Sequence, residues 1–136
     1  MSVGILLITH GTVGRVLLQS AVDVLGVCPL PTTSLEAPLA CDPDKTLEEA
    51  RRAAAKLDSG EGVLVLTDLY GSTPSNIACR LRDLHRVRVV SGVNLPMLIR
   101  VLNYPDLDLE QLTNKAVTGG RDGVLTCNRE DVNHAG

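Results

Sequence analysis

Residues 3–12 carry the sequence VGILLITHGT, and this stretch decides the fold. The run from Val3 to Thr9 has the length and composition of a buried β-strand, because a strand covered on both faces of a parallel sheet shows no polar alternation. A helical pattern follows at once, with Leu17 and Ala21 on one face. The predicted strand therefore delivers His10 directly before a helix.

The same strand-then-helix unit recurs along the chain. Residues 63–67, VLVLT, form a second apolar run, and a helix start follows at Thr73-Pro74. Further patterns complete the alternation: strands at 32–35 and 87–91, and helices beginning near Asp42, Asn94 and Asp108. This order is typical of an α/β domain, a doubly wound open sheet, mostly parallel, with helices on both faces.

The C-terminal part of the chain is predicted to end the domain with a strand. Two successive glycines, Gly119-Gly120, are expected to break the last helix, because glycine is a poor helix former. Gly123–Cys127 is then a last edge strand. Residues 1–127 are expected to form one domain, and residues 128–136 a polar, disordered tail.

Composition excludes several classes of function. The chain has 136 residues, 44% of them hydrophobic, with a net charge of -3 and no Phe or Trp. Single-stranded nucleic acid is commonly bound by stacking bases on aromatic side chains, and the phosphate backbone requires a basic surface. We therefore expect no nucleic-acid partner.

The pattern of cysteines and apolar residues favours a cytoplasmic protein. No apolar run reaches the roughly 20 residues that span a bilayer, and the N-terminus lacks the features of a secretory signal. The four cysteines are widely scattered, without the spacing of a metal site, and are expected to be reduced packing residues: Cys28, Cys41, Cys79 and Cys127. We expect no metal and no cofactor.

Polar residues suited to phosphoryl chemistry follow the two apolar runs. In an open parallel sheet, ligands collect beyond the carboxyl ends of the strands. His10 offers an imidazole that can act as a nucleophile, and Asp68 offers a carboxylate that can orient the ring and stabilise its positive charge. Backbone N–H groups and hydroxyls that could surround a phosphoryl group come from Gly71, Ser72 and Thr73, and from Gly11 and Thr12.

These motifs alone leave other interpretations open. His10 could be a hydrogen-bonded structural residue, Asp68 could cap a turn, and Gly-Ser-Thr-Pro is a common helix start. A non-covalent flavodoxin-like module for a small molecule or nucleotide is the main alternative, although no glycine-rich dinucleotide motif or P-loop lysine is present. A hydrolase using His10 and Asp68 would lack an evident serine or cysteine nucleophile. The group Arg80, Arg82, Arg86 and Arg88 reads as an exposed helix end and strand flank.

Three segments carry a resemblance to a known family. They are ITHG at residues 8–11, VLTDLYGSTPSN at 65–76 and VSGVNLPML at 90–98. With these segments the chain, from Val3 to about Val124, resembles the IIA domain of the mannose family of the bacterial phosphoenolpyruvate-dependent sugar phosphotransferase system.

The resemblance implies a phosphohistidine carrier, a phosphotransferase component. The histidine matching His10 would accept a phosphoryl group from the phosphocarrier protein HPr and pass it to a IIB protein, with the aspartate matching Asp68 orienting the ring. Gly71, Ser72 and Thr73 would surround the phosphoryl group. The family fold also implies a homodimer in which the last strand, here Gly123–Cys127, pairs with the partner.

Two features depart from the family pattern. Many members carry a fused IIB domain, whereas these 136 residues contain none. We therefore expect transfer to a separate IIB protein for sugar uptake, with the membrane involved only through IIC and IID subunits, or a role as a phosphorylation-state regulator. Ser72 stands where relatives often have a second glycine, which changes the expected cradle modestly.

Overall fold

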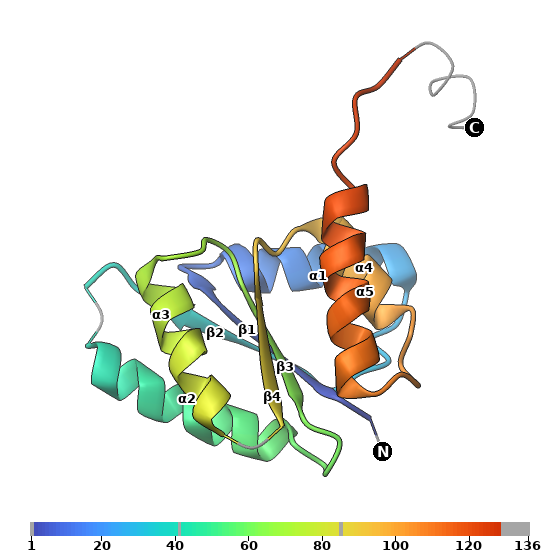
Figure 1. Ribbon diagram of the computed structural model, residues 1–136. Coiled ribbons are helices and arrows are strands. Elements are labelled where there is room, and N and C mark those ends of the chain that lie inside the picture. Colours follow the sequence, from blue (N-terminus) through green and yellow to red (C-terminus); the bar gives the residue numbers. More distant parts are fainter. Residues whose placement is uncertain (1, 41, 85, 129–136) are drawn as a thin grey trace.

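A computed structural model describes residues 2–40, 42–84 and 86–128. Within these residues the strands form one parallel sheet, as predicted, and the structure gives their order as β2-β1-β3-β4 (Figure 1). Their bounds are β1 Gly4–His10, β2 Thr32–Ala37, β3 Val63–Thr67 and β4 Val87–Ser91. The two strands with the strongest apolar runs, β1 and β3, occupy the centre of the sheet, and their apolar sequences fit strands that are covered on both faces.

Helices cover both faces of this sheet. Their bounds are α1 Val13–Leu25, α2 Pro43–Leu57, α3 Thr73–Arg80, α4 Leu95–Leu102 and α5 Leu109–Asp122, with a 3₁₀ turn at Leu81–Asp83. One face packs against α1, α4 and α5, and the other against α2 and α3 (Figure 1). The doubly wound α/β architecture predicted from the alternation is confirmed.

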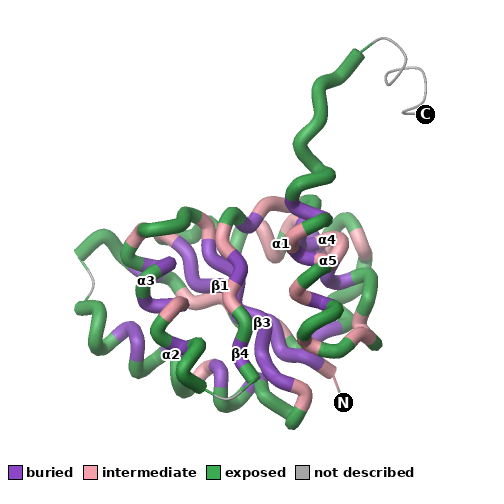
Figure 2. Tube along the Cα trace, in the orientation of Figure 1, coloured by how far each residue is buried: buried purple, intermediate pink, exposed green. Residues whose placement is uncertain are grey.

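The core divides into two layers because side chains alternate along each strand. In β1, Ile5 and Leu7 enter the layer under α1, α4 and α5, while Leu6 and Ile8 enter the layer under α2 and α3. All four side chains are fully buried, and the central strands form the buried centre in Figure 2. Aliphatic residues thus fill a core that has no Phe or Trp.

The strand register positions the functional residues. Ile8 of β1 pairs with Thr67, the last residue of β3, and β1 continues for two more residues. His10 therefore lies level with the loop that follows β3. We call the side of the sheet where the strands end the carboxyl edge.

The predicted break at Gly119-Gly120 is wrong, since α5 continues through both glycines to Asp122. Both glycines are buried against α4, where a Cβ on Gly119 would lie 2.6 Å from Arg100 Cβ. Close helix packing thus overrides the weak helix propensity of glycine. Leu84, which follows the 3₁₀ turn, is exposed.

The predicted last strand does not form within the single chain. Residues 124–128 have no regular secondary structure, and the chain leads away from the sheet after α5 (Figure 1). Val124 and Leu125 are 77% and 81% exposed. A strand needs the backbone of a neighbouring strand to satisfy its own polar groups, and none of the described strands pairs with this segment. Apart from Asn128, the predicted disordered tail lies outside the described residues.

Other predictions concern metals, membranes and thiols. Cys28, Cys79 and Cys127 are free thiols, whereas Cys41 lies outside the described residues. No group of three potential metal ligands occurs in the described part of the chain. None of the helices in those residues has the length and apolar character required to cross a membrane.

Candidate functional site

His10 and Asp68 meet at the carboxyl edge of the sheet. One carboxylate oxygen, Asp68 Oδ2, accepts a hydrogen bond from the backbone N–H of His10 at 3.1 Å and lies 3.0 Å from its Nδ1. A carboxylate can only accept here, so Nδ1 carries the proton and Nε2 of the neutral ring keeps its lone pair. The His10 side chain is 44% exposed and that of Asp68 only 15%, so the ring is accessible while its partner is shielded.

The second oxygen of this carboxylate is buried. Asp68 Oδ1 has no hydrogen-bond partner among the described residues, and the same holds for the buried hydroxyl of the preceding Thr67. Among the described residues, the carboxylate therefore accepts hydrogen bonds only at Oδ2, and His10 donates both of them. Ring orientation and backbone position at His10 thus depend on the same atom.

The loop after His10 leaves a hydroxyl free. Thr12 occupies the N-cap position of α1, yet its side chain makes no capping hydrogen bond. Instead the buried Thr9 hydroxyl accepts from the backbone N–H of Gly14 at 2.7 Å. Thr9 thus satisfies one of the free N–H groups at the start of α1, that of Gly14. The exposed Thr12 hydroxyl and the exposed Gly11 backbone remain at the carboxyl edge.

The loop after β3 forms a tight turn before α3. Ser72 is the N-cap, and its hydroxyl accepts from Ser75 N at 3.4 Å and donates to the Leu69 carbonyl at 2.5 Å. The Ser72 N–H donates to the same carbonyl at 3.2 Å. Gly71 has φ +83°, a left-handed conformation that glycine adopts without strain. Ser72 therefore closes the turn.

Two of the predicted phosphoryl donors are already engaged. The Gly71 N–H donates to the buried Ser75 hydroxyl at 3.2 Å, and the Ser72 N–H donates to Leu69. Thr73, by contrast, is exposed at the first position of α3, and its hydroxyl has no partner in the described residues. Among the described residues, Thr73 thus keeps an unengaged hydroxyl, whereas the Gly71 and Ser72 N–H groups are bonded within the turn.

Thr9 and Ser75 were missed by the sequence reasoning. Both are fully or almost fully buried, and both accept a hydrogen bond from a glycine N–H in the loops beside His10. A threonine at the end of an apolar run and a serine at the third position of a helix were the available signals. Neither signal shows which backbone N–H the hydroxyl will accept.

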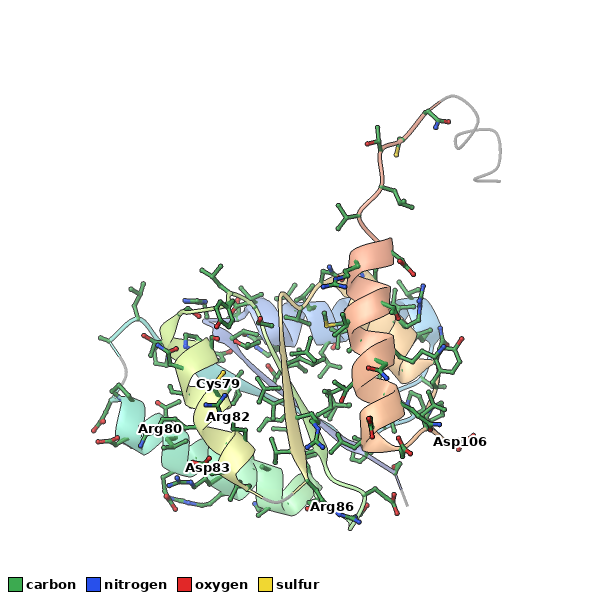
Figure 3. The ribbon with its side chains drawn as sticks, viewed as in Figure 1. Cys79, Arg80, Arg82, Asp83, Arg86 and Asp106 are labelled. Atoms are coloured by element: carbon green, nitrogen blue, oxygen red, sulfur yellow. The ribbon has the colours of Figure 1, made fainter. Side chains whose placement is uncertain are left out.

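The arginine group lies outside this site. Figure 3 shows Arg80, Arg82 and Arg86 along α3 and the segment that follows it, and all three residues are exposed. Arg80 pairs with Asp44 at 3.4 Å. The interpretation as an exposed helix end and strand flank is confirmed, and no arginine of this group contributes to the His10 loops.

A cavity is present elsewhere on the molecule. It has a volume of about 470 Å³, lies beside the free edge of β4, and is lined by Val89, Met97, Val117 and Val124 among others. Neither His10 nor Asp68 lines it. The candidate site at His10 and Asp68 is therefore separate from this cavity.

Known proteins are similar to this chain both in sequence and in fold. A family model described as "PTS system fructose IIA component" matches residues 4–117. The chain is 32% identical, over 99% of its length, to the mannose-specific EIIAB component of Escherichia coli K12, and it covers 42% of that relative. It is 33% identical to the fructose-specific EIIA component of Bacillus subtilis, with 61% of this chain and 59% of the relative covered.

A solved structure agrees with these matches. The mannose/sorbose-specific IIA subunit from Enterococcus faecalis superimposes with a TM-score of 0.83 at 25% identity, covering 94% of this chain and 96% of that one. The chain spans less than half of the length of the Escherichia coli relative that it matches. Together with the family model, these similarities show that the chain belongs to the mannose–fructose family of phosphotransferase-system IIA components.

Proposed function

We propose that the protein carries a phosphoryl group on Nε2 of His10, accepting it from HPr. In the transfer, Nε2 attacks the phosphorus atom, a P–N bond forms to His10, and the P–N bond to the donor histidine of HPr breaks. The leaving imidazole keeps the electron pair of that bond. The observation that carries this proposal is the His10–Asp68 pair, which holds the proton on Nδ1 and stabilises the cationic ring as the new bond forms.

The phosphoryl oxygens would be held without a cationic side chain. We assign this role to the hydroxyls of Thr12 and Thr73 and to the Gly11 backbone, with Gly71 and Ser72 shaping the turn. The N-termini of α1 and α3 add their positive ends. Hydroxyls and helix ends hold a phosphoryl group less firmly than a lysine would, which suits a protein that must pass the group onward.

The partners of this reaction would be proteins that dock at the carboxyl edge. Leu39, Leu69 and Tyr70 are exposed in the loops that follow β2 and β3, next to the candidate site. An apolar rim of this kind suits contact with another protein surface. We assign HPr as donor and a separate IIB protein as acceptor, with the carrier in the cytoplasm and membrane subunits handling the sugar.

We further propose that two copies form a homodimer. Each chain has an exposed apolar segment, Val124–Leu125, and its β4 edge pairs with no strand in the described residues. A second copy could cover both features by adding residues 123–127 to the sheet.

Intact-protein mass spectrometry tests the carrier function. The purified chain is incubated with phosphoenolpyruvate, enzyme I and HPr, beside a His10→Ala variant. We expect the mass of one phosphoryl group, labile in acid, on the native chain and not on the variant. Absence of this gain with active HPr and folded protein would remove the carrier proposal and favour the non-covalent module. Adding a IIB protein then tests onward transfer.

A further inference from the structure

The hydroxyl of Ser75 is buried beneath the turn that faces His10. The residue is 1% exposed and lies at the third position of α3. Its Oγ accepts the Gly71 N–H at 3.2 Å, while its own N–H donates to the Ser72 hydroxyl at 3.4 Å. Ser72 and Ser75 therefore form a reciprocal arrangement related to the helix capping box. It differs in that the side chain at the third helical position accepts from Gly71, the residue before the N-cap, and not from the N-cap itself.

This arrangement controls the conformation of Gly71. Apart from Gly71 itself and its two chain neighbours, no described residue has a heavy atom within 4 Å of the position that a Gly71 Cβ would occupy, so side-chain packing does not fix this residue. A glycine populates positive and negative φ about equally, so its observed φ of +83° needs some other restraint. The hydrogen bond to Ser75 supplies that restraint, together with the Ser72 N–H···O=C Leu69 bond that closes the turn.

The restraint also decides which donors face a phosphoryl group. With its N–H directed to the buried Ser75 oxygen, Gly71 cannot donate toward the carboxyl edge. The next residues of the loop, Ser72 and Thr73, then begin α3 with the Thr73 hydroxyl exposed. A change of conformation at Gly71 would move Thr73 relative to His10.

We propose that Ser75 is a positioning residue for phosphoryl transfer, acting through the Gly71 N–H to fix the β3–α3 turn and its donors. The inference rests on the proposed carrier function of His10. Rates of group transfer depend steeply on the placement of donors, and a misplacement of about 1 Å can reduce a rate about 100-fold. Loss of the Ser75 acceptor therefore slows transfer both to and from His10.

The test uses Ser75→Ala and Ser75→Cys in the full chain, with Ser20→Ala on α1 as a matched control. Alanine removes the acceptor and part of the volume, whereas cysteine keeps the volume and replaces the oxygen by a weak acceptor. Transfer from phospho-HPr is followed over time by mass spectrometry at several HPr concentrations, with circular dichroism to confirm folding. Two-dimensional NMR follows the exchange of the Gly71 amide with solvent.

We expect both Ser75 variants to lower the maximal rate constant of transfer about ten-fold with an unchanged half-saturating concentration of phospho-HPr, because the exposed docking rim is intact. The Gly71 amide exchanges faster in both, and Ser20→Ala behaves as the native chain. The inference is overturned if the maximal rate constant of transfer stays native while the Gly71 amide loses protection. It is also overturned if Ser75→Cys transfers at the native rate while Ser75→Ala is slow, because packing volume would then be responsible. A native chain that gains no phosphoryl group would instead contradict the carrier function itself.

Discussion

At the scale of single residues, His10 depends on one oxygen atom for both its position and its protonation. Asp68 Oδ2 accepts hydrogen bonds from the backbone N–H and from the ring Nδ1 of His10. A side chain that accepts both bonds fixes the main chain at the end of β1 as well as the ring. The carboxylate therefore positions both the backbone and the ring of His10, in addition to placing a negative charge beside the ring.

Replacing Asp68 by Asn is expected to slow phosphorylation of His10 roughly 1,000-fold. The amide group can donate to Nδ1 and so favours the wrong tautomer, and it carries no charge to stabilise the phosphorylated ring. A time course of transfer from phospho-HPr measures the effect. Asp106→Asn, at an exposed carboxylate in the loop before α5, serves as control. Equal rates for the two variants would refute the orienting role of Asp68.

Replacing Thr9 by Val is expected to destabilise the fold by about 1–3 kcal/mol, because the buried N–H of Gly14 loses its acceptor. Urea unfolding measures this change in free energy. Thr118→Val is the matched control, since the Thr118 hydroxyl bonds to α5 carbonyls at an exposed position. A loss no larger than that of the control would mean that Thr9 does not cap α1.

At the scale of secondary-structure elements, α4 and α5 are joined by the side chain of Asn94, which bonds to the backbone of both helices. The Asn94 side chain accepts from Met97 N at 2.9 Å, which caps α4, and donates to the Gly120 carbonyl of α5 at 3.2 Å. The Val93 N–H donates to the Thr67 carbonyl, next to Asp68. The unusual segment 90–98 therefore connects the helix pair to the end of β3.

Replacing Gly119 by Ala is expected to destabilise the protein by about 1–3 kcal/mol, although alanine is the better helix former. The added Cβ would lie 2.6 Å from Arg100 Cβ, close to the main chain of α4, so the helices must separate. Thermal or urea unfolding gives the difference. Asn114→Ala, at an exposed position of the same helix, is expected to be neutral or slightly stabilising. Stabilisation by both variants would contradict close packing at Gly119.

The elements that sequence predicted correctly are those with local causes. Apolar runs located β1 and β3, and helix starts at Asp42-Pro43, Asn94 and Asp108 were visible because each cap acts within a few residues. The predicted break at Gly119-Gly120 was wrong because the helix continues there through contact with α4, whose residues lie far away in the chain.

The candidate site divides in the same way. Two strand ends in a parallel sheet were sufficient to bring His10 and Asp68 together. The acceptors for Gly14 and Gly71 were not predictable, because a hydroxyl can bond to many nearby groups and only the folded loops select one.

At the scale of the whole molecule, a strand edge and an apolar segment are left uncovered by the residues that the structure describes. The free edge of β4 lies beside the 470 Å³ cavity, and the segment after α5 leads away from the sheet (Figure 1). Uncovered edges promote pairing with another chain. Both features lie on the β4 and α5 side of the molecule, so one interface could bury both.

Leu125→Lys is expected to convert a dimer to a monomer. Light scattering coupled to size exclusion should give about twice the chain mass of 14.5 kDa for the native protein and a single chain mass for the variant. A charged residue in the paired segment would lose its hydration on burial. Lys115→Ala, on α5, provides a control that alters charge without touching the segment. A native protein that is monomeric at all concentrations would exclude the proposed dimer.

The exposure of Tyr70 has an optical consequence. The chain has no Trp and two tyrosines, so its ultraviolet emission comes from Tyr70 and Tyr104. Tyr70 is exposed immediately before Gly71, whereas Tyr104 lies under the Lys115 ammonium at 4.4 Å from the ring centre. A Tyr104→Phe variant would therefore be a label-free fluorescent probe, whose single emitter sits where a partner protein would arrive.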